Sequence, residues 1–335
     1  MKRILVTGGL GFIGSHTVVE LQNSGYDVVI IDNLSNSKIE VLDNITSITE
    51  KKPDYHNIDL RNKKDVQHFF QQEKIDGIIH FAASKAVGES VEQPLKYYEN
   101  NITTLVYLLQ EMKKHKISNF IFSSSCTVYG QSDELPITEK APVKSAESPY
   151  GNTKQIGEEI IQESCKADGL TAISLRYFNP IGAHESAKIG ELPLGVPQNL
   201  IPFVTQTAAG IREQLSVFGG DYPTPDGTAI RDYIHVVDLA QAHIVALERL
   251  INNKNKSDYE VYNVGTGKGS SVLEVIQVFE KISNTSLNYK IVDRREGDIT
   301  AAYANTTLAN KELGWKAKKS IEEALSSAWK WQQNQ

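Results

Sequence analysis

A glycine-rich loop near the start of the chain constrains the fold more than any other feature. Gly8, Gly11 and Gly14 have the spacing G-x-x-G-x-x-G, with a short apolar run (residues 4–6) before them and a helical pattern (residues 12–23) after them. At such a helix N-terminus, backbone N–H groups can approach a pyrophosphate closely because no Cβ atoms stand in the way. A glycine triplet alone indicates little more than a turn, but between a strand and a helix it predicts a dinucleotide-binding βαβ unit.

Alternating strand and helix patterns extend this unit through the first half of the chain. Short apolar runs rich in β-branched residues recur at residues 4–6, 28–31, 77–81, 119–122 and 172–175. Helical patterns, such as residues 96–114, lie between them. This alternation predicts an α/β fold with a Rossmann-like, doubly wound parallel sheet.

The pattern loosens beyond Phe178, and a chain of 335 residues is long enough to form two lobes. Loops rich in Pro, Gly and Asp separate shorter elements, which we expect as strands at 230–235 and 259–264 and helices at 237–250 and 272–282. We expect a dinucleotide-binding domain at residues 1–180 and a smaller C-terminal α/β substrate lobe at residues 181–335. Part of the segment 230–265 should return to the main sheet, because residues 259–264 are apolar.

Charge and cysteine content exclude several classes of protein. With 35 Lys and Arg against 41 Asp and Glu, the net charge is −6, so we expect neither a nucleic-acid surface nor an anionic-membrane binder. An anionic substrate would need a local cluster of Arg and Lys. Cys126 and Cys165 form no disulfide framework, and no group of residues has metal-ligand spacing, so we expect a reducing cytoplasm and no metal. We also expect no signal peptide and no membrane span.

Asp32, at the end of the second expected strand, bears on the choice of cofactor. A carboxylate there accepts hydrogen bonds from both ribose hydroxyls of NAD and repels the 2′-phosphate of NADP. Asp32 therefore favours NAD, although an aspartate is also typical of a strand-end turn and Lys38 nearby weakens the repulsion. Asp59, after the third strand, can contact the adenine edge or cap the helix that starts near Asn62, and both interpretations stay open.

A tyrosine and a lysine four residues apart predict the chemical site. Tyr150 and Lys154 would share one face of a helix, where the ammonium and a positive nicotinamide ring favour the ionised phenol. A phenolate can take a proton from a substrate hydroxyl as hydride leaves the same carbon. The serine run 123–125 ends a strand just upstream, and Ser125 is best suited to hydrogen-bond the same oxygen. Many such pairs are only a buried tyrosine beside a solvated lysine, but the order of the motifs favours one crevice.

Together these motifs resemble the extended short-chain dehydrogenase/reductase family, and within it the UDP-glucose 4-epimerase family. The resemblance covers essentially the whole chain. Beyond the glycine loop, Ser125 and the Tyr-x-x-x-Lys pair, it rests on Asp32-Asn33-Leu34-Ser35-Asn36-Ser37, His80-Phe81-Ala82-Ala83, Lys85-Ala86-Val87-Gly88-Glu89-Ser90, Tyr177-Phe178-Asn179-Pro180, Arg231-Asp232-Tyr233-Ile234-His235 and Arg294-Arg295-Glu296-Gly297-Asp298. The last two motifs are far more specific than the glycine loop.

The resemblance implies an isomerase that interconverts UDP-glucose and UDP-galactose. NAD+ would accept hydride from C4 of the sugar while Tyr150 removes the 4-hydroxyl proton. The 4-keto sugar would then turn about its link to UDP, and hydride would return to its other face. Because no net redox change occurs, NAD would stay bound. The resemblance also implies that residues 1–180 bind NAD, that residues 181–335 bind the UDP-sugar, and that helices at 96–114 and 150–168 form a homodimer.

The family's site residues carry over to matching positions of this chain. Ser125, Tyr150 and Lys154 would be catalytic, with Lys154 contacting the nicotinamide ribose and tuning Tyr150. The implied cofactor-binding residues are Gly8, Gly11, Phe12, Ile13, Gly14, Asp32, Asn33, Asp59, Leu60, Phe81, Ala82, Lys85, Asn100, Tyr150, Lys154 and Tyr177. The implied substrate-binding residues are Ser125, Asn179, Asn199, Leu200, Phe218, Arg231, Arg295, Asp298 and Ala302.

Within this set, the guanidinium forks of Arg231 and Arg295 suit a diphosphate, and Asp298 would hold the uridine ribose. Phe218 fits core packing nearly as well as a place beside the uracil. Ala302 aligns with a position where a tyrosine is associated with rejection of N-acetylated sugars. Because alanine leaves room for an acetamido group, we also expect activity on UDP-N-acetylglucosamine and UDP-N-acetylgalactosamine.

Other functions on the same fold stay open at this point. A nucleotide-sugar 4,6-dehydratase would need an acid/base pair, usually in a Thr-Asp-Glu run, where this chain has Ser125-Cys126-Thr127. A simple alcohol dehydrogenase would leave the two arginine motifs unexplained. A non-catalytic NAD-binding regulator would share the fold without the chemistry, and the intact Ser125, Tyr150 and Lys154 argue against it.

Overall fold

The computed structural model describes residues 1–295 and 297–335, and Glu296, part of one motif quoted above, lies outside them. A seven-stranded parallel sheet has the order β11-β6-β5-β4-β1-β2-β3. Its strands are β1 Arg3–Thr7, β2 Asp27–Ile31, β3 Asp54–His56, β4 Gly77–His80, β5 Asn119–Ser125, β6 Thr171–Tyr177 and β11 Tyr259–Val264. The order reverses between β1 and β4, so the predicted doubly wound, Rossmann-like class is confirmed.

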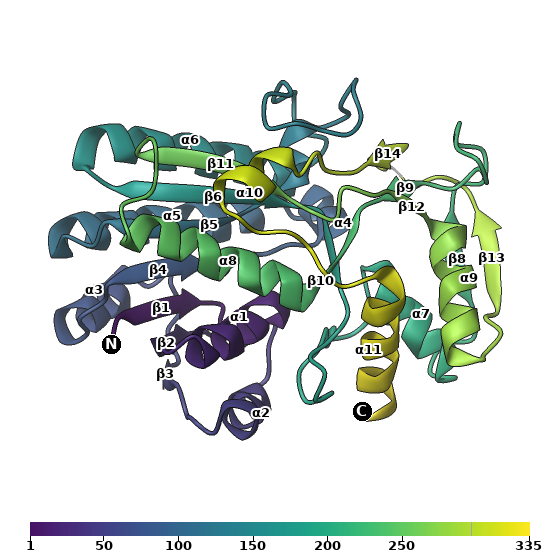
Figure 1. Ribbon diagram of the computed structural model, residues 1–335, viewed down its shortest axis with the longest axis horizontal. Coiled ribbons are helices and arrows are strands. Elements are labelled where there is room, and N and C mark those ends of the chain that lie inside the picture. Colours follow the sequence, from purple (N-terminus) through teal and green to yellow (C-terminus); the bar gives the residue numbers. More distant parts are fainter. Residues whose placement is uncertain (296) are drawn as a thin grey trace.

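Helices cover both faces of this sheet (Figure 1), because successive side chains of a strand point to opposite faces. The helices in this part of the chain, with the 3-10 turn η1, are α1 Phe12–Asn23, α2 Glu40–Thr49, α3 Lys63–Gln72, α4 Val87–Glu92, α5 Pro94–His115, η1 Cys126–Tyr129, α6 Pro149–Asp168 and α8 Val236–Ile251. Ile4 and Val6 of β1 join a core with α1 and α8, whereas Leu5 joins a core with α3, α5 and α6. Each such fully buried side chain stabilises the fold by about 1.5–3 kcal/mol.

Shorter elements form the rest of the chain, and several of them build a separate core. They are β7 Asn179–Ile181, α7 Leu200–Ala208, β8 Leu215–Phe218, β9 Ile230–Arg231, β10 Tyr233–His235, β12 Ser270–Ser271, α9 Val272–Ser283, β13 Tyr289–Val292, β14 Ala301–Ala302, α10 Thr307–Glu312 and α11 Ile321–Gln333. Val204 of α7, Phe279 of α9 and Leu325 of α11 meet in this core. Capping boxes at Ser271 and Ser320 fix where α9 and α11 begin.

The expectation of one strand over residues 230–235 is wrong. β9 pairs with β12 and β14, whereas β10 pairs with β7 in another sheet. Asp232 separates them, and its buried carboxylate accepts hydrogen bonds from the N–H groups of Thr266 and Ala304 at 2.8 and 3.1 Å. A buried carboxylate needs such donors, so the chain breaks the strand where they can reach it.

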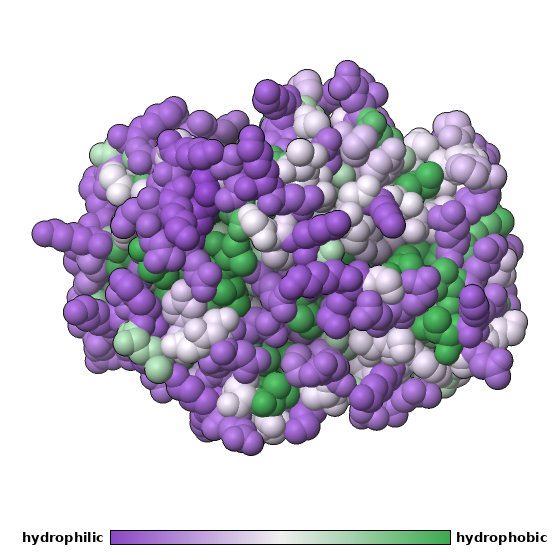
Figure 2. All heavy atoms as spheres, viewed as in Figure 1, coloured by the Kyte–Doolittle hydropathy of each residue, from purple (hydrophilic) through white to green (hydrophobic). Residues whose placement is uncertain are grey.

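Hydrophilic side chains dominate the face shown in Figure 2, and hydrophobic ones appear on it as scattered patches. No helix within the described residues is both long enough and apolar enough to cross a bilayer.

The glycine loop has no space for a side chain at Gly14, because a Cβ there would overlap the carbonyl oxygen of Gly8. We expect Gly14→Ala to lower the free energy of unfolding by about 1–3 kcal/mol, since the backbone must shift. Gly88→Ala is the matched control, because a Cβ at Gly88 meets nothing within 4 Å. Urea denaturation measures both, and equal stability of the two variants would contradict this packing argument.

Candidate active site

The carboxyl ends of β1 and β4 meet where the strand order reverses, and the glycine loop lies there. Gly8 follows β1 with φ +67°, and a Cβ on it would lie 2.9 Å from the backbone nitrogen of Ala82, which follows β4. Gly11 is the N-cap of α1 and brings no side-chain cap, so backbone N–H groups at this helix start stay available to an anion. Gly8 therefore needs to be glycine, and with the free N–H groups at the start of α1 the loop fits a dinucleotide pyrophosphate.

Asp32 follows β2 and is fixed by protein donors. One carboxylate oxygen accepts hydrogen bonds from the Leu34 N–H at 2.9 Å and the Ser37 hydroxyl at 2.8 Å. The other oxygen accepts the Leu10 N–H at 3.1 Å, which ties Asp32 to the glycine loop. A carboxylate has about four lone-pair positions, so this arrangement orients Asp32 and leaves it able to accept from a ribose.

Asn33 and Asp59 come together beside Asp32. Arg61, the larger influence, and the nearby Asn33 side chain hold the pKa of Asp59 below its ordinary value. Asn62, not Asp59, supplies the side-chain cap of α3 by accepting the Lys64 N–H. The cap interpretation of Asp59 is therefore wrong.

Helix α6 brings Tyr150 and Lys154 to the end of β5. Ser148 caps the helix and Pro149 occupies its first turn, which fixes its start just before Tyr150. Tyr150 and Lys154 are 9% and 4% exposed, and the lysine Nζ lies 5.8 Å from the centre of the tyrosine ring. The side chain of Ser125, the last residue of β5, lies near enough to the Tyr150 phenol to lower its pKa. The three predicted catalytic residues thus lie together.

Burial governs the charges of this trio. Burial raises the pKa of Tyr150 far above its ordinary value, and the nearby Ser125 hydroxyl opposes this shift. Burial also lowers the pKa of Lys154 to about 8, opposed by the Glu158 carboxylate. The Lys154 Nζ donates to the Ser123 carbonyl oxygen at 2.7 Å. Forming a phenolate at Tyr150 therefore requires positive charge close by.

Other predicted cofactor residues gather on the same edge of the sheet. The Tyr177 hydroxyl hydrogen-bonds to the Ser123 hydroxyl, and the rings of Phe81 and Tyr177 lie 4.7 and 6.0 Å from that of His243. Asn100 donates to the Ser84 hydroxyl at 3.3 Å. Phe12 and Ile13 open α1 directly after Gly11, and Leu60 is buried in the core beneath α3 and α5.

Predicted substrate residues of the second lobe form a charged group. Asp298 accepts a hydrogen bond from Arg295 at 2.8 Å and pairs with Arg231 at 3.6 Å. Phe218, at the end of β8, is 42% exposed, with its ring 5.6 Å from the Arg295 guanidinium. The core-packing interpretation of Phe218 is therefore wrong. Ala302 of β14 is the register partner of Arg231, which places it beside this group.

Glu191, which the sequence did not identify, joins predicted residues of the two lobes. One of its carboxylate oxygens accepts hydrogen bonds from Lys85 at 3.2 Å and from Asn199 at 2.5 Å. Leu200 begins α7 next to Asn199, and Asn179 lies in β7. Glu191 lies in an irregular loop without periodicity, so no local sequence signal marked it.

Glu158 and Asn101 were missed as well. Glu158 follows Lys154 by one helical turn, so the spacing 150, 154, 158 was a usable signal. Asn101, next to the predicted Asn100, is buried and donates to the Ser84 carbonyl oxygen and the Thr153 hydroxyl, both at 3.0 Å.

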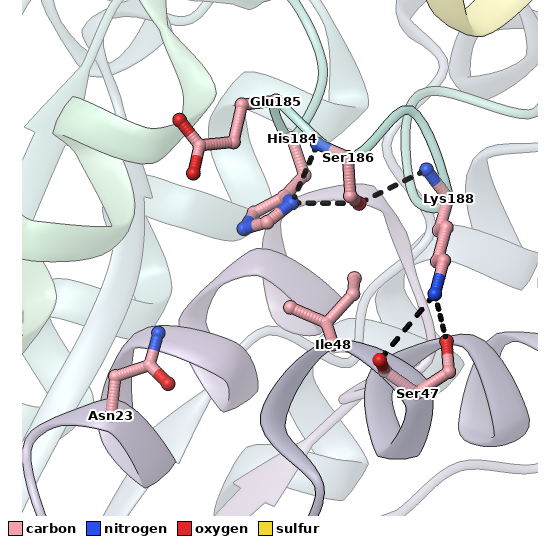
Figure 3. A pocket seen from close by; sticks show the side chains of 7 residues that line it. All are labelled: Asn23, Ser47, Ile48, His184, Glu185, Ser186 and Lys188. Carbon is pink, nitrogen blue, oxygen red and sulfur yellow. Dashed lines mark hydrogen bonds between the residues drawn. The ribbon is translucent and has the colours of Figure 1, made fainter.

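A surface hollow lies at the junction of α1, α2 and the loop after β7 (Figure 3). It is lined by Asn23, Ser47, Ile48, His184, Glu185, Ser186 and Lys188, none of which is a predicted site residue. Among the described residues, no three or more His, Cys, Asp or Glu side chains are placed to hold a metal ion.

The sheet order, the glycine loop and the Ser125–Tyr150–Lys154 trio define an extended short-chain dehydrogenase/reductase. A family model described as GDP-mannose 4,6 dehydratase matches residues 5–328. A UDP-glucose 4-epimerase of Bacillus subtilis is 51% identical over 330 residues, covering 98% of this chain and 96% of the relative.

Two solved structures are similar over nearly their whole length. One, a UDP-glucose 4-epimerase of Stenotrophomonas maltophila with NAD and formylated UDP-arabinopyranose, is 44% identical, with a TM-score of 0.96 and coverage of 100% of this chain and 98% of that one. The other, from Bifidobacterium longum with NAD+ and UDP, is 47% identical, with a TM-score of 0.95 and coverage of 99% and 98%. The chain belongs to the UDP-glucose 4-epimerase family.

The Lys154 ammonium must stay charged to favour ionisation of Tyr150, so we expect kcat to fall as pH rises through about 8. The folded pKa lies below the ordinary lysine value of about 10.4, so the charge is lost around pH 8 rather than around the ordinary value. Measurement of kcat against pH with UDP-galactose tests this. Lys154→Arg, which stays charged, should remove the alkaline fall, and a flat wild-type profile from about pH 7 to 10 would contradict the assignment.

Proposed function

We propose that the protein is an NAD-dependent UDP-glucose 4-epimerase that interconverts UDP-glucose and UDP-galactose. The observation that carries this proposal is that Ser125, Tyr150 and Lys154 meet at the sheet edge that also carries the glycine loop. The relatives named above, each called a UDP-glucose 4-epimerase, support it. The residues around the loop fit NAD, because Asp32 offers a carboxylate to an unphosphorylated ribose.

Bound NAD supplies the acceptor and the donor of hydride at C4 of the sugar. Tyr150 takes the proton of the 4-hydroxyl, Ser125 holds the same oxygen, and Lys154 favours the ionised phenol. Arg231 and Arg295 hold the diphosphate, so the 4-keto sugar turns about its link to UDP while its anchor stays in place. Tyr150 then returns a proton to the oxygen after re-reduction from the other face of the sugar.

Beside Ser125, the structure lacks the acid and the base that a nucleotide-sugar 4,6-dehydratase would need. Elimination would need an acid and a base beside Ser125, where the chain has Cys126 and Thr127. Burial raises the pKa of the Cys126 thiol to about 11, so it is a poor acid or base at neutral pH.

The organisation of the protein follows from the same proposal. Residues 1–180, with β11 added to their sheet, bind NAD, and residues 181–335 supply the UDP-sugar side. We place the dimer interface on α5 and α6, which pack against each other. The free cysteines, Cys126 and Cys165, suit a reducing cytoplasm.

Replacement of the phenol tests the chemistry directly. Tyr150→Phe should lower kcat for UDP-galactose about 100- to 10,000-fold, because no group remains to take the 4-hydroxyl proton. Purified wild-type protein given UDP-galactose without added cofactor should produce UDP-glucose, identified by chromatography. Wild-type speed in Tyr150→Phe, or a 4-keto-6-deoxy product from the wild type, would refute the proposal.

We further propose that Ala302 lets the site accept N-acetylated sugars. Ala302 packs in a cluster with Phe178, and Cys126, next to Ser125, packs against that cluster, which supports a place for Ala302 at the wall of the sugar site. The wild type should epimerise UDP-N-acetylglucosamine, and Ala302→Tyr should lower this activity about 10-fold or more while UDP-galactose is still turned over. A wild type that ignores the N-acetylated sugars would disprove this assignment.

A further inference from the structure

A buried ion pair lies one helical turn behind the catalytic lysine. Glu158 follows Lys154 on the same face of α6, and its carboxylate meets the guanidinium of Arg176 from β6. We propose that Glu158, held by Arg176 and Ser124, is a positioning residue that keeps Lys154 charged and so sets the pH range in which Tyr150 acts. This inference rests on the proposed function, in which Tyr150 accepts the substrate proton.

Three hydrogen bonds hold the buried Glu158 carboxylate. One oxygen accepts the Ser124 hydroxyl at 2.5 Å and Arg176 Nε at 2.9 Å, and the other accepts a terminal Arg176 nitrogen at 2.5 Å. Both side chains are less than 10% exposed. The Arg176 guanidinium also lies 4.8 Å from the centre of the Tyr129 ring, a second contact that holds it beside the carboxylate.

The end of β5 fixes Glu158 relative to Lys154. The Ser123 carbonyl oxygen accepts the Lys154 ammonium, and the hydroxyl of the next residue, Ser124, donates to Glu158. Two successive residues of β5 therefore fix the position of the Lys154 ammonium relative to the Glu158 carboxylate. A packing role would need no such arrangement, because a buried ion pair adds little stability compared with apolar residues of similar size.

Several titratable groups lie close to Lys154 or to the Glu158–Arg176 ion pair, on the elements packed around them. They are Tyr150 of α6, Tyr129 of η1, Tyr259 of β11, His80 of β4 and Glu139 of the loop after η1. Burial lowers the pKa of His80 to about 3 and raises the pKa of Tyr129 and Tyr259 above the ordinary tyrosine value, so these three groups are neutral near pH 7. Glu139 accepts a hydrogen bond from the Asn263 N–H. Glu158 is the carboxylate that favours the charged form of Lys154.

Removal of Glu158 and removal of Arg176 should shift the pKa of Lys154 in opposite directions. Without Glu158, the unpaired Arg176 cation opposes the Lys154 ammonium, so the lysine loses its proton at lower pH. Without Arg176, the unpaired carboxylate favours the ammonium, so the lysine keeps its proton to higher pH. A purely structural role would move the alkaline fall of kcat in neither variant, because both would only lose stability.

The first experiment compares kcat against pH, with UDP-galactose as substrate. Glu158→Gln should move the alkaline fall about one pH unit lower and Arg176→Gln should move it higher, while the double variant should return close to wild type. Glu260→Gln is the control, because Arg249–Glu260 is an equally buried bidentate pair, 8% exposed on each side. It should lose stability with no change in the alkaline fall. Shifts of the same sign in both single variants would overturn the proposal.

The second experiment needs neither cofactor nor turnover. A double-mutant cycle of Lys154→Met and Glu158→Gln, read by urea denaturation, should show a favourable coupling at about pH 7 that disappears at about pH 10, where Lys154 is neutral. Coupling that does not change with pH would overturn the proposal. If Glu158→Gln does not fold, Arg176→Gln and the double variant, which buries no unpaired charge, decide the question. Failure of the wild type to epimerise UDP-galactose would sink the proposed function and leave this coupling readable.

Discussion

The reversal of strand order between β1 and β4 is the constraint on which the rest of the structure depends. The chain segments that leave these two neighbouring strands turn to opposite faces of the sheet, so the two connections diverge at its carboxyl edge. Gly8 can approach Ala82 there only because it lacks a side chain. The next strands outward, β5 and β6, then deliver Ser125 and Tyr177 to the same edge. A one-residue slip of β5 would turn Ser125 to the other face and dismantle the site.

At this edge of the sheet, burial disfavours both charges of the proposed catalytic pair, the Tyr150 phenolate and the Lys154 ammonium. Removing water makes Tyr150 harder to ionise and makes Lys154 easier to discharge, and both changes work against a phenolate–ammonium pair. The chain compensates with fixed groups that favour the ammonium, the Ser123 carbonyl and the Glu158 carboxylate, and with the Ser125 hydroxyl on the phenol. Such groups need not reorganise when charge moves, which is how a dry site can still run proton transfer.

Features set by neighbours in the sequence could be predicted, and features set by distant partners could not. The strand alternation, the bounds of α1 and the shared face of Tyr150 and Lys154 follow from local periodicity and spacing. The break of the expected strand at Asp232 depends on donors more than thirty residues away, at Thr266 and beyond. Glu191 likewise contacts Lys85 and Asn199, which lie near it only in the folded chain, so its place could not be predicted from the sequence around it. Local sequence periodicity thus identifies the helices and strands. Hydrogen bonds from distant residues to a buried carboxylate decide where the strand at Asp232 breaks.

Because the chain is acidic and its proposed ligand carries a diphosphate, the binding site must offset the repulsion between them. The candidate ligand-binding cations are already paired in this structure, Lys85 with Glu191 and both Arg231 and Arg295 with Asp298. Pairing keeps each cation oriented and spares the ligand-free protein a cluster of like charges. A diphosphate that takes these cations exchanges one anion for another, so the net gain comes from bidentate geometry rather than from raw attraction. That exchange favours a ligand whose two phosphates span both arginines over a small anion that reaches only one.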